Sequence, residues 1–70
     1  MEQRKRKPYK SFMAWMLVND ISRKEIQELL NIKASTLAHR LNGTGADFTM
    51  KEVRTLVAKY GEGVGDFFLI

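Results

Sequence analysis

The sequence contains no cysteine and only one histidine, His39. Without cysteine it can form neither a disulfide framework nor a thiolate metal site, and a single imidazole without clustered carboxylates provides no metal-ligand set. It also shows no nucleophile paired with its base and no glycine-rich phosphate loop. We therefore expect a protein that is not an enzyme and that binds no metal or cofactor.

Long apolar runs are also missing. The longest, Phe12 to Val18, is far shorter than the roughly 20 residues that a membrane-spanning helix needs. It also lacks the small-residue cleavage pattern of a secretory signal. We expect a soluble, intracellular protein that makes no contact with a membrane.

Proline occurs once, at Pro8, and the excess of positive charge is confined to its neighbourhood. Residues 1–10 carry five basic side chains and one acidic side chain, whereas residues 11–70 carry seven of each sign. The formal net charge of +4 therefore lies entirely in the N-terminal segment. We predict a basic, disordered arm at residues 1–8, followed by one domain at residues 9–70. Such an arm is either a solvated terminus or a segment that follows DNA phosphates or enters a minor groove.

The composition is that of a compact helical domain, with 44% hydrophobic and 29% charged residues in a chain of 70. The periodicity of the apolar residues predicts an all-α fold of four or five helices. The expected helices cover residues 9–20, 23–30, 33 or 34 to 41, and a stretch that follows Thr49 and ends near Tyr60, with a short helix or turn at 64–70.

Several of the expected helix ends carry recognisable signals. The spacing of a capping box occurs twice, at Ser22 with Glu25 and at Thr49 with Glu52. Asn31 stands where a chain that leaves a helix needs a left-handed residue, and asparagine tolerates that conformation better than most residues. The sequence therefore predicts a tight turn after the second helix.

The second and third expected helices are joined by a turn of about three residues. We expect apolar side chains to hold the two helices together and to leave the start of the third helix free on its other side. These side chains are Ile26, Leu30, Ile32 and Leu37. This is the geometry of a helix-turn-helix, whose second helix enters the major groove of DNA. The sequence thus predicts a recognition helix at about residues 33–41.

The segment that carries this pattern is ISRKEIQELLNIKASTLAHRLNG, residues 21–43. It resembles the lambda-repressor-like (Cro/XRE-type) helix-turn-helix DNA-binding family of phages and bacteria, and the later Asp47-Phe48-Thr49 extends the resemblance to roughly residues 10–68. The resemblance implies a compact lambda-repressor-like domain that acts as a sequence-specific transcription regulator, a Cro-like repressor occupying an operator in double-stranded DNA. It also implies a cytoplasmic, nucleoid-associated protein of a bacterial cell or a phage-infected host.

The same resemblance implies which residues would contact DNA. Base edges would be met by Ala34, Ser35 and His39, bases or phosphates by Lys33 and Thr36, and the DNA backbone by Arg23, Arg40 and Asn42. Two positions depart from the family pattern. Gln27 stands where the family normally keeps alanine beneath the third helix, and Asn31 replaces the usual turn glycine. Gln27 therefore bears on how the two helices cross.

Some apolar side chains exceed what so small a core can cover. They lie at the C-terminus, in Phe67, Phe68, Leu69 and Ile70, and on the first helix, in Met13 and Leu17. Either set could form the interface of a homodimer, since proteins of the resembled family bind paired half-sites. The same surplus supports a different function, that of a protein-binding module on a helix-turn-helix scaffold, such as an antirepressor or a modulator of a phage or host regulator.

Overall fold

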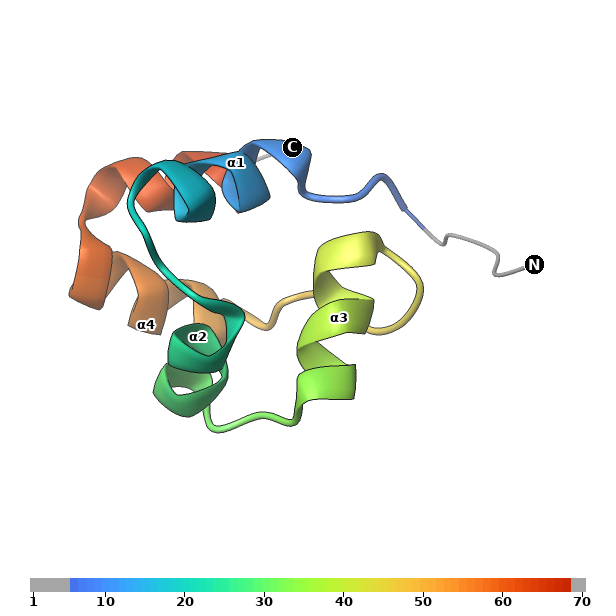
Figure 1. Cartoon of the computed structure of the whole chain (residues 1–70). Helices are drawn as coiled ribbons and strands as arrows, with labels where there is room; N and C mark the ends of the chain where they lie inside the picture. Colours follow the sequence, from blue (N-terminus) through green and yellow to red (C-terminus); the bar gives the residue numbers. More distant parts are fainter. Residues whose placement is uncertain (1–5, 69–70) are drawn as a thin grey trace.

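The computed structural model describes residues 6–68, and over this range the chain is entirely helical (Figure 1). Its elements are α1 (Lys10–Val18), α2 (Arg23–Leu30), α3 (Ala34–Asn42), α4 (Met50–Tyr60) and a 3-10 helix, η1 (Glu62–Phe68). The prediction of an all-α fold with four or five helices is confirmed. No helix in this range is long and apolar enough to cross a membrane.

The helix ends follow from short-range hydrogen bonds. At α4 the capping box is complete, because the Thr49 hydroxyl accepts from the Glu52 amide and the Glu52 carboxylate accepts from the Thr49 amide. At α2 the box is half formed. The Ser22 hydroxyl accepts from the Glu25 amide at 3.1 Å, but the Glu25 carboxylate instead accepts a 2.5 Å hydrogen bond from the Tyr60 hydroxyl. A tertiary contact thus replaces half of the predicted local one.

Helix α1 is shorter than the predicted 9–20, because its last turn is closed early. The Asn19 side chain donates to the Trp15 carbonyl at 2.8 Å, and Asp20 then adopts a left-handed conformation with φ of 59°. Aspartate is one of the few non-glycine residues that tolerate this region. The chain therefore turns away from the axis of α1 two residues before the predicted end.

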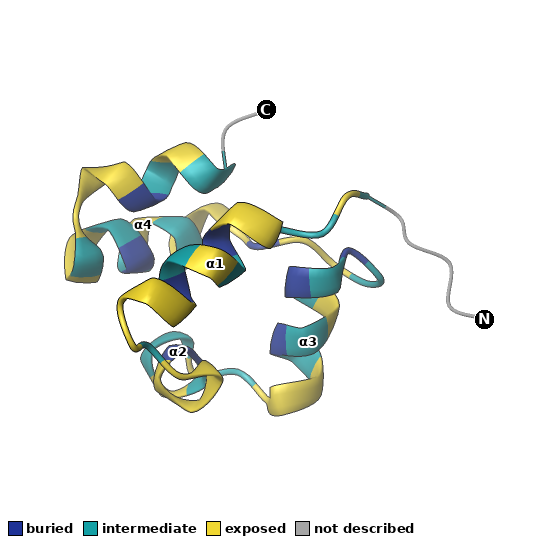
Figure 2. Ribbon diagram, turned by 45° about the horizontal axis from the view of Figure 1, so that its top comes forward, coloured by how far each residue is buried: buried dark blue, intermediate teal, exposed yellow. Residues whose placement is uncertain are grey.

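Every α-helix contributes to one core. The side chains with no exposed surface are Phe12 of α1, Ile26 of α2, Leu37 and Leu41 of α3, and Leu56 of α4. Figure 2 shows the buried positions of the helices turned toward a common interior. Burying side chains of this size stabilises a fold by about 1.5–3 kcal/mol each, so each helix depends on the others for its stability.

Phe67 and Phe68 close this core from the end of the described chain. The Phe12 ring lies 5.8 Å from the Phe67 ring and 5.1 Å from the Phe68 ring, measured between centroids. Both phenylalanines are only partly exposed. The expectation that they form a dimer interface is therefore wrong for most of their surface, which packs within the same chain. Leu69 and Ile70, expected to share that interface, lie outside the described residues.

The N-terminal segment is bound to the end of α3. The Tyr9 amide donates to the Leu41 carbonyl at 2.9 Å, and the Arg6 amide donates to the Gly43 carbonyl at 3.3 Å. Gly43 has φ of 76°, and a Cβ atom at this position would clash with the Arg6 carbonyl oxygen. Within the predicted arm of residues 1–8, Arg6 is therefore held against the end of α3, while residues 1–5 lie outside the described range.

Candidate nucleic-acid interface

Helices α2 and α3 are joined by a three-residue connection, residues 31–33. Asn31 adopts the predicted left-handed conformation, with φ of 56° and ψ of 50°. The amides of Asn31 and Ile32 both donate to the Gln27 carbonyl oxygen. Gln27 itself is half-buried, so the turn forms with glutamine in the place where the resembled family keeps alanine.

The two helices pack directly against each other and run in clearly different directions (Figure 1). Ile26 from α2 and Leu37 from α3 are both fully buried in the shared core. Since the inner side of α3 is fixed in this way, its other side faces away from the molecule. The exposed start of α3 is visible in Figure 2, on the side away from α1.

The outward face of α3 carries small polar groups. Ser35 and His39 are four residues apart, so they lie one above the other on the same face of the helix, and both are exposed. Lys33 and Ala34 are exposed at the helix start, and Thr36 is half-buried. Of the predicted contact residues, Ser35 and His39 therefore share one exposed face of α3, while Lys33 and Ala34 are exposed at its start.

Arg40 does not belong to this surface. Its side chain is only 12% exposed, and its Nη2 donates to Oε2 of Glu52 at 3.1 Å. Its Nε lies 2.9 Å from Oε1 of the same carboxylate, although the N–H is poorly aligned with that oxygen. The guanidinium therefore joins α3 to the first turn of α4, and the contact of Arg40 with the DNA backbone stays a prediction.

The remaining predicted contact residues occupy other surroundings. The Arg23 side chain is exposed and lies back toward α1, with Nη2 3.7 Å from the sulfur of Met13. Asn42 is half-buried at the last position of α3. Arg23 is therefore not on the face formed by Ser35 and His39, whereas Asn42, three residues after His39, lies at the C-terminal end of that side of α3.

His39 also shapes the loop that follows α3. Its Nδ1 lies 2.7 Å from the Thr44 hydroxyl, and a Cβ atom at Gly45 would come within 2.9 Å of the His39 Cβ. The imidazole is thereby oriented by the loop rather than free to rotate. A fixed ring offers its second nitrogen to a ligand with little loss of side-chain entropy.

The charged side chains of α3 and its flanking turns are all basic. No Asp or Glu occurs in residues 31–46. The next acidic residue, Asp47, accepts hydrogen bonds from the Tyr9 hydroxyl at 2.7 Å and from the Phe48 amide at 2.7 Å, and it lies 3.2 Å from Nε of Arg6. Burial and the hydrogen bond to Asp47 raise the pKa of Tyr9. The exposed face of α3 is therefore free of uncompensated negative charge.

The Arg6 guanidinium caps the end of α3. It donates to the carbonyl oxygens of Gly45 at 2.6 Å, Arg40 at 2.9 Å and Ala46 at 3.1 Å. A cation at this place satisfies carbonyls that have no partner within the helix and complements the helix dipole. This role of Arg6 could not be predicted from the sequence, because nothing near Arg6 indicates that it binds carbonyls some forty positions later.

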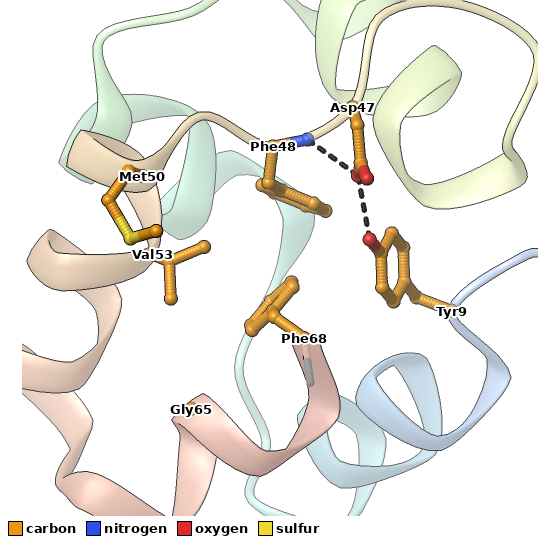
Figure 3. A pocket seen from close by; sticks show the side chains of 7 residues that line it. All are labelled: Tyr9, Asp47, Phe48, Met50, Val53, Gly65 and Phe68. Carbon is orange, nitrogen blue, oxygen red and sulfur yellow. Dashed lines mark hydrogen bonds between the residues drawn. The ribbon is translucent and has the colours of Figure 1, made fainter. Parts of the chain in front are cut away.

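A hollow of about 180 Å³ lies away from the exposed face of Ser35 and His39 (Figure 3). It is lined by Tyr9, Asp47, Phe48, Met50, Val53, Gly65 and Phe68. Its polar groups, the Tyr9 hydroxyl and the Asp47 carboxylate, are hydrogen-bonded to each other. No group of three or more His, Asp or Glu side chains within residues 6–68 is placed to hold a metal ion.

Comparison with known proteins adds no relative: no protein-family model, curated protein or solved structure matches this chain. The evidence that bears on function is therefore the arrangement of α2 and α3, with Ser35 and His39 exposed on α3.

Proposed function

We propose that this protein binds double-stranded DNA through a helix-turn-helix formed by α2, residues 31–33 and α3. In this proposal it is a sequence-specific transcription regulator of the lambda-repressor-like kind, a repressor that occupies an operator. The observation that carries the proposal is the two-sided character of α3. Ser35 and His39 are exposed on one side, while Leu37 and Leu41 are fully buried on the other. A helix with one exposed face and one buried face can enter the major groove.

The chemistry of this face predicts how it would read DNA. Ser35 donates or accepts and bonds to more than one base, Ala34 offers only a methyl contact to thymine, and the second ring nitrogen of His39 contacts a base edge. Lys33, at the start of α3, pairs with a phosphate. With no exposed arginine on this face, the specificity is looser than that of an arginine-guanine contact.

The charges predict modest electrostatic attraction. Arg40 is paired with Glu52 and Arg6 with Asp47, so neither guanidinium is available to a phosphate. Lys33 is then the cation at the start of α3, beside the face formed by Ser35 and His39. Because the salt dependence of binding scales with the number of phosphates neutralised, we expect a shallow slope for residues 6–68.

The test begins with selection of binding sequences from a random duplex library at low salt. Fluorescence anisotropy then compares the affinity for the selected duplex with that for random DNA. The double variant Ser35→Ala, His39→Ala is expected to bind the selected duplex about tenfold or more weakly. Its affinity for random DNA should be nearly unchanged. Ser11→Ala, an exposed serine of α1, is the control and should change neither.

Two results would contradict the proposal. An equal loss of specific and random affinity in the double variant would show that Ser35 and His39 do not read bases. Absence of binding to any duplex at low salt would reject DNA binding as the function.

A second function is supported by a different observation. Leu17 and Val18 are 83% and 84% exposed at the end of α1, and residues 11–70 carry no net charge. Both features suit a module that captures another protein, such as a repressor, on the same scaffold. Salt-insensitive binding to such a protein, together with no affinity for duplex DNA, would favour this function.

A further inference from the structure

The hydroxyl of Thr44 is in contact with the one histidine of the chain. Oγ1 of Thr44 lies 2.7 Å from Nδ1 of His39, and the sequence contains no other histidine. His39 is exposed on α3, whereas Thr44 is half-buried in the loop that follows this helix. The contact therefore links the face formed by Ser35 and His39 to the loop.

The backbone of the loop holds Thr44 in place. The Gly43 carbonyl accepts from the Arg6 amide at 3.3 Å, and the Gly45 carbonyl accepts from Nη1 of Arg6 at 2.6 Å. The Thr44 amide itself donates to the His39 carbonyl at 3.2 Å. Three consecutive residues of the loop are thus anchored, so the Thr44 hydroxyl is presented to the imidazole from a fixed position.

The nature of this partner bears on which ring nitrogen of neutral His39 carries the proton. A protonated Nδ1 usually donates to a carboxylate or a backbone carbonyl, but residues 31–46 contain no Asp or Glu. The partner of Nδ1 is instead a hydroxyl, which can itself donate. The structure gives this hydroxyl no other hydrogen-bond partner among residues 6–68. Because a buried donor without an acceptor is costly, the Thr44 hydroxyl should donate and Nδ1 should accept.

We infer that Thr44 fixes His39 as the tautomer with its proton on Nε2, so that the ring presents an N–H donor on the exposed face of α3. Thr44 is then a positioning residue, because it acts through the His39 ring. The outward nitrogen keeps this proton when the ring is neutral and when it is charged, since both nitrogens of a charged imidazole are donors. The donor is therefore present in either state of the ring.

The identity of the group that meets this donor rests on the proposed function, in which α3 enters the major groove. A donor there requires an acceptor on the base edge. Guanine offers two neighbouring acceptors, N7 and O6, whereas cytosine presents an amino donor and adenine places an amino donor beside N7. Thymine offers the single acceptor O4. The base pair selected opposite His39 is therefore G·C, with guanine facing the ring.

Nuclear magnetic resonance of the protein without DNA tests the tautomer. Long-range ¹H–¹⁵N correlation distinguishes the two ring nitrogens, and the single histidine makes the signals unambiguous. At mildly alkaline pH, where an imidazole is neutral, the wild type should show the proton on Nε2. Thr44→Val keeps the size of the side chain without its hydroxyl and should give a mixture of tautomers. Thr44→Ser keeps the donor and should restore the wild-type signals.

The matched control is Thr55→Val on α4. The Thr55 hydroxyl also makes one internal hydrogen bond, to the Lys51 carbonyl at 2.9 Å, and Thr55 is half-buried like Thr44. Its replacement should leave the His39 signals unchanged. Circular dichroism should show that all three threonine variants keep the helical fold.

The base preference is tested on the selected duplex by changing each base pair in turn and measuring affinity by fluorescence anisotropy. For the wild type, replacement of one G·C pair should weaken binding by about five- to tenfold through the lost contact with His39. His39→Ala should abolish the preference at that pair and retain the preferences elsewhere. Thr44→Val should reduce the same preference at least about twofold, and Thr44→Ser should retain it. A merely structural role of Thr44 would instead weaken binding to every duplex alike.

Two results overturn the inference. A proton on Nδ1 in the wild type, or the same tautomer mixture in the wild type and in Thr44→Val, would show that Thr44 does not place the proton. Loss of a preference other than G·C in His39→Ala would overturn the assignment of a donor facing guanine. If the resonance signals are as expected but no duplex binds, the guanine contact fails with the proposed function while the role of Thr44 stands, so the two failures are distinguishable.

Discussion

The side chain of Arg40 joins α3 to the first turn of α4. Its partner, Glu52, already accepts the Thr49 amide at 3.0 Å through Oε1, so one carboxylate holds both the helix cap and the guanidinium. Both charged side chains are 12% exposed. Removing one member of such a pair leaves a poorly solvated charge without its counterion.

We therefore expect Arg40→Ala to lower the free energy of unfolding by about 3 kcal/mol. Urea denaturation, followed by the fluorescence of the single tryptophan, Trp15, measures the change. Arg54→Ala, an exposed arginine of α4, is the matched control and should stay within about 0.5 kcal/mol of the wild type. Equal stability of the two variants would show that the ion pair contributes nothing to the fold.

Tyr60 provides a second prediction at the level of single residues. Burial, followed by the hydrogen bond to Glu25, raises the pKa of Tyr60 to about 12. Between the ordinary pKa of about 10 and this value, the folded state keeps a proton that the unfolded chain has released. The contribution of Tyr60 to stability is therefore complete below about pH 10 and is lost as the pH rises toward 12.

Ultraviolet difference absorbance of tyrosinate measures the titration. Glu25→Gln should lower the pKa of Tyr60 because it removes the negative charge, but the pKa should stay above its ordinary value because burial, the larger cause, remains. Glu28→Gln changes an exposed carboxylate on the same helix and should leave the titration as it is. An identical titration in both variants would contradict the assigned role of Glu25.

Among the elements, the connection between α2 and α3 depends on the backbone of Asn31. A left-handed conformation costs most residues roughly 1–2 kcal/mol, while glycine adopts it freely. We expect Asn31→Ala to lower the free energy of unfolding by about 1 kcal/mol. Asn31→Gly should come closer to the wild type, because it relieves the same strain. If chemical denaturation shows alanine to be as stable as glycine at this position, the left-handed turn does not govern the stability of the α2–α3 unit.

The segment before α1 belongs to the folded domain from Arg6 onward. Its backbone is bonded to Leu41 and Gly43, and the Arg6 guanidinium covers the carbonyls at the end of α3. Of the other basic residues of this segment, Lys7 and Lys10 are exposed, and Arg4 and Lys5 lie outside the described residues. A truncation that removes Arg6 as well would confuse loss of charge with loss of structure.

At the scale of the whole molecule, a shorter truncation separates these effects. Deleting residues 2–5 removes Arg4 and Lys5 and retains Arg6. We expect binding to selected and random DNA to weaken alike and the slope of log affinity against log salt to become shallower by up to about 2. Chemical denaturation should show unchanged stability. An unchanged salt slope would exclude phosphate contacts by this segment.

Much of the fold was predictable because its signals are local. The bounds of α2, the left-handed Asn31 and the complete box at Thr49 depend on residues at most a few positions apart, and the structure confirms them. The contacts of Arg6, Arg40 and Phe68, which the sequence did not predict, depend on partners farther along or back in the chain. A basic or apolar side chain carries no local sign of such a partner.

At the candidate site too, features set by residues close in sequence could be predicted, and features set by distant residues could not. The exposure of Ser35 and His39 follows from the helical period and the apolar residues between them, so the sequence suffices to predict it. The pairing of Arg40 with Glu52 requires α4 to fold back on α3, and no periodicity encodes that. Ser35 and His39 thus share an exposed face as the sequence predicts, while the Arg40 side chain turns toward α4.

The contact of Phe12 with Phe67 and Phe68 also sets an order in time. About 55 residues separate Phe12 from Phe67, and at 5–20 residues per second a ribosome needs roughly 3–11 s to add them. Helical proteins of this size fold in microseconds to milliseconds once their contacts can form. During synthesis, α1 is therefore made seconds before Phe67 and Phe68 can pack on Phe12, a delay longer than folding itself takes.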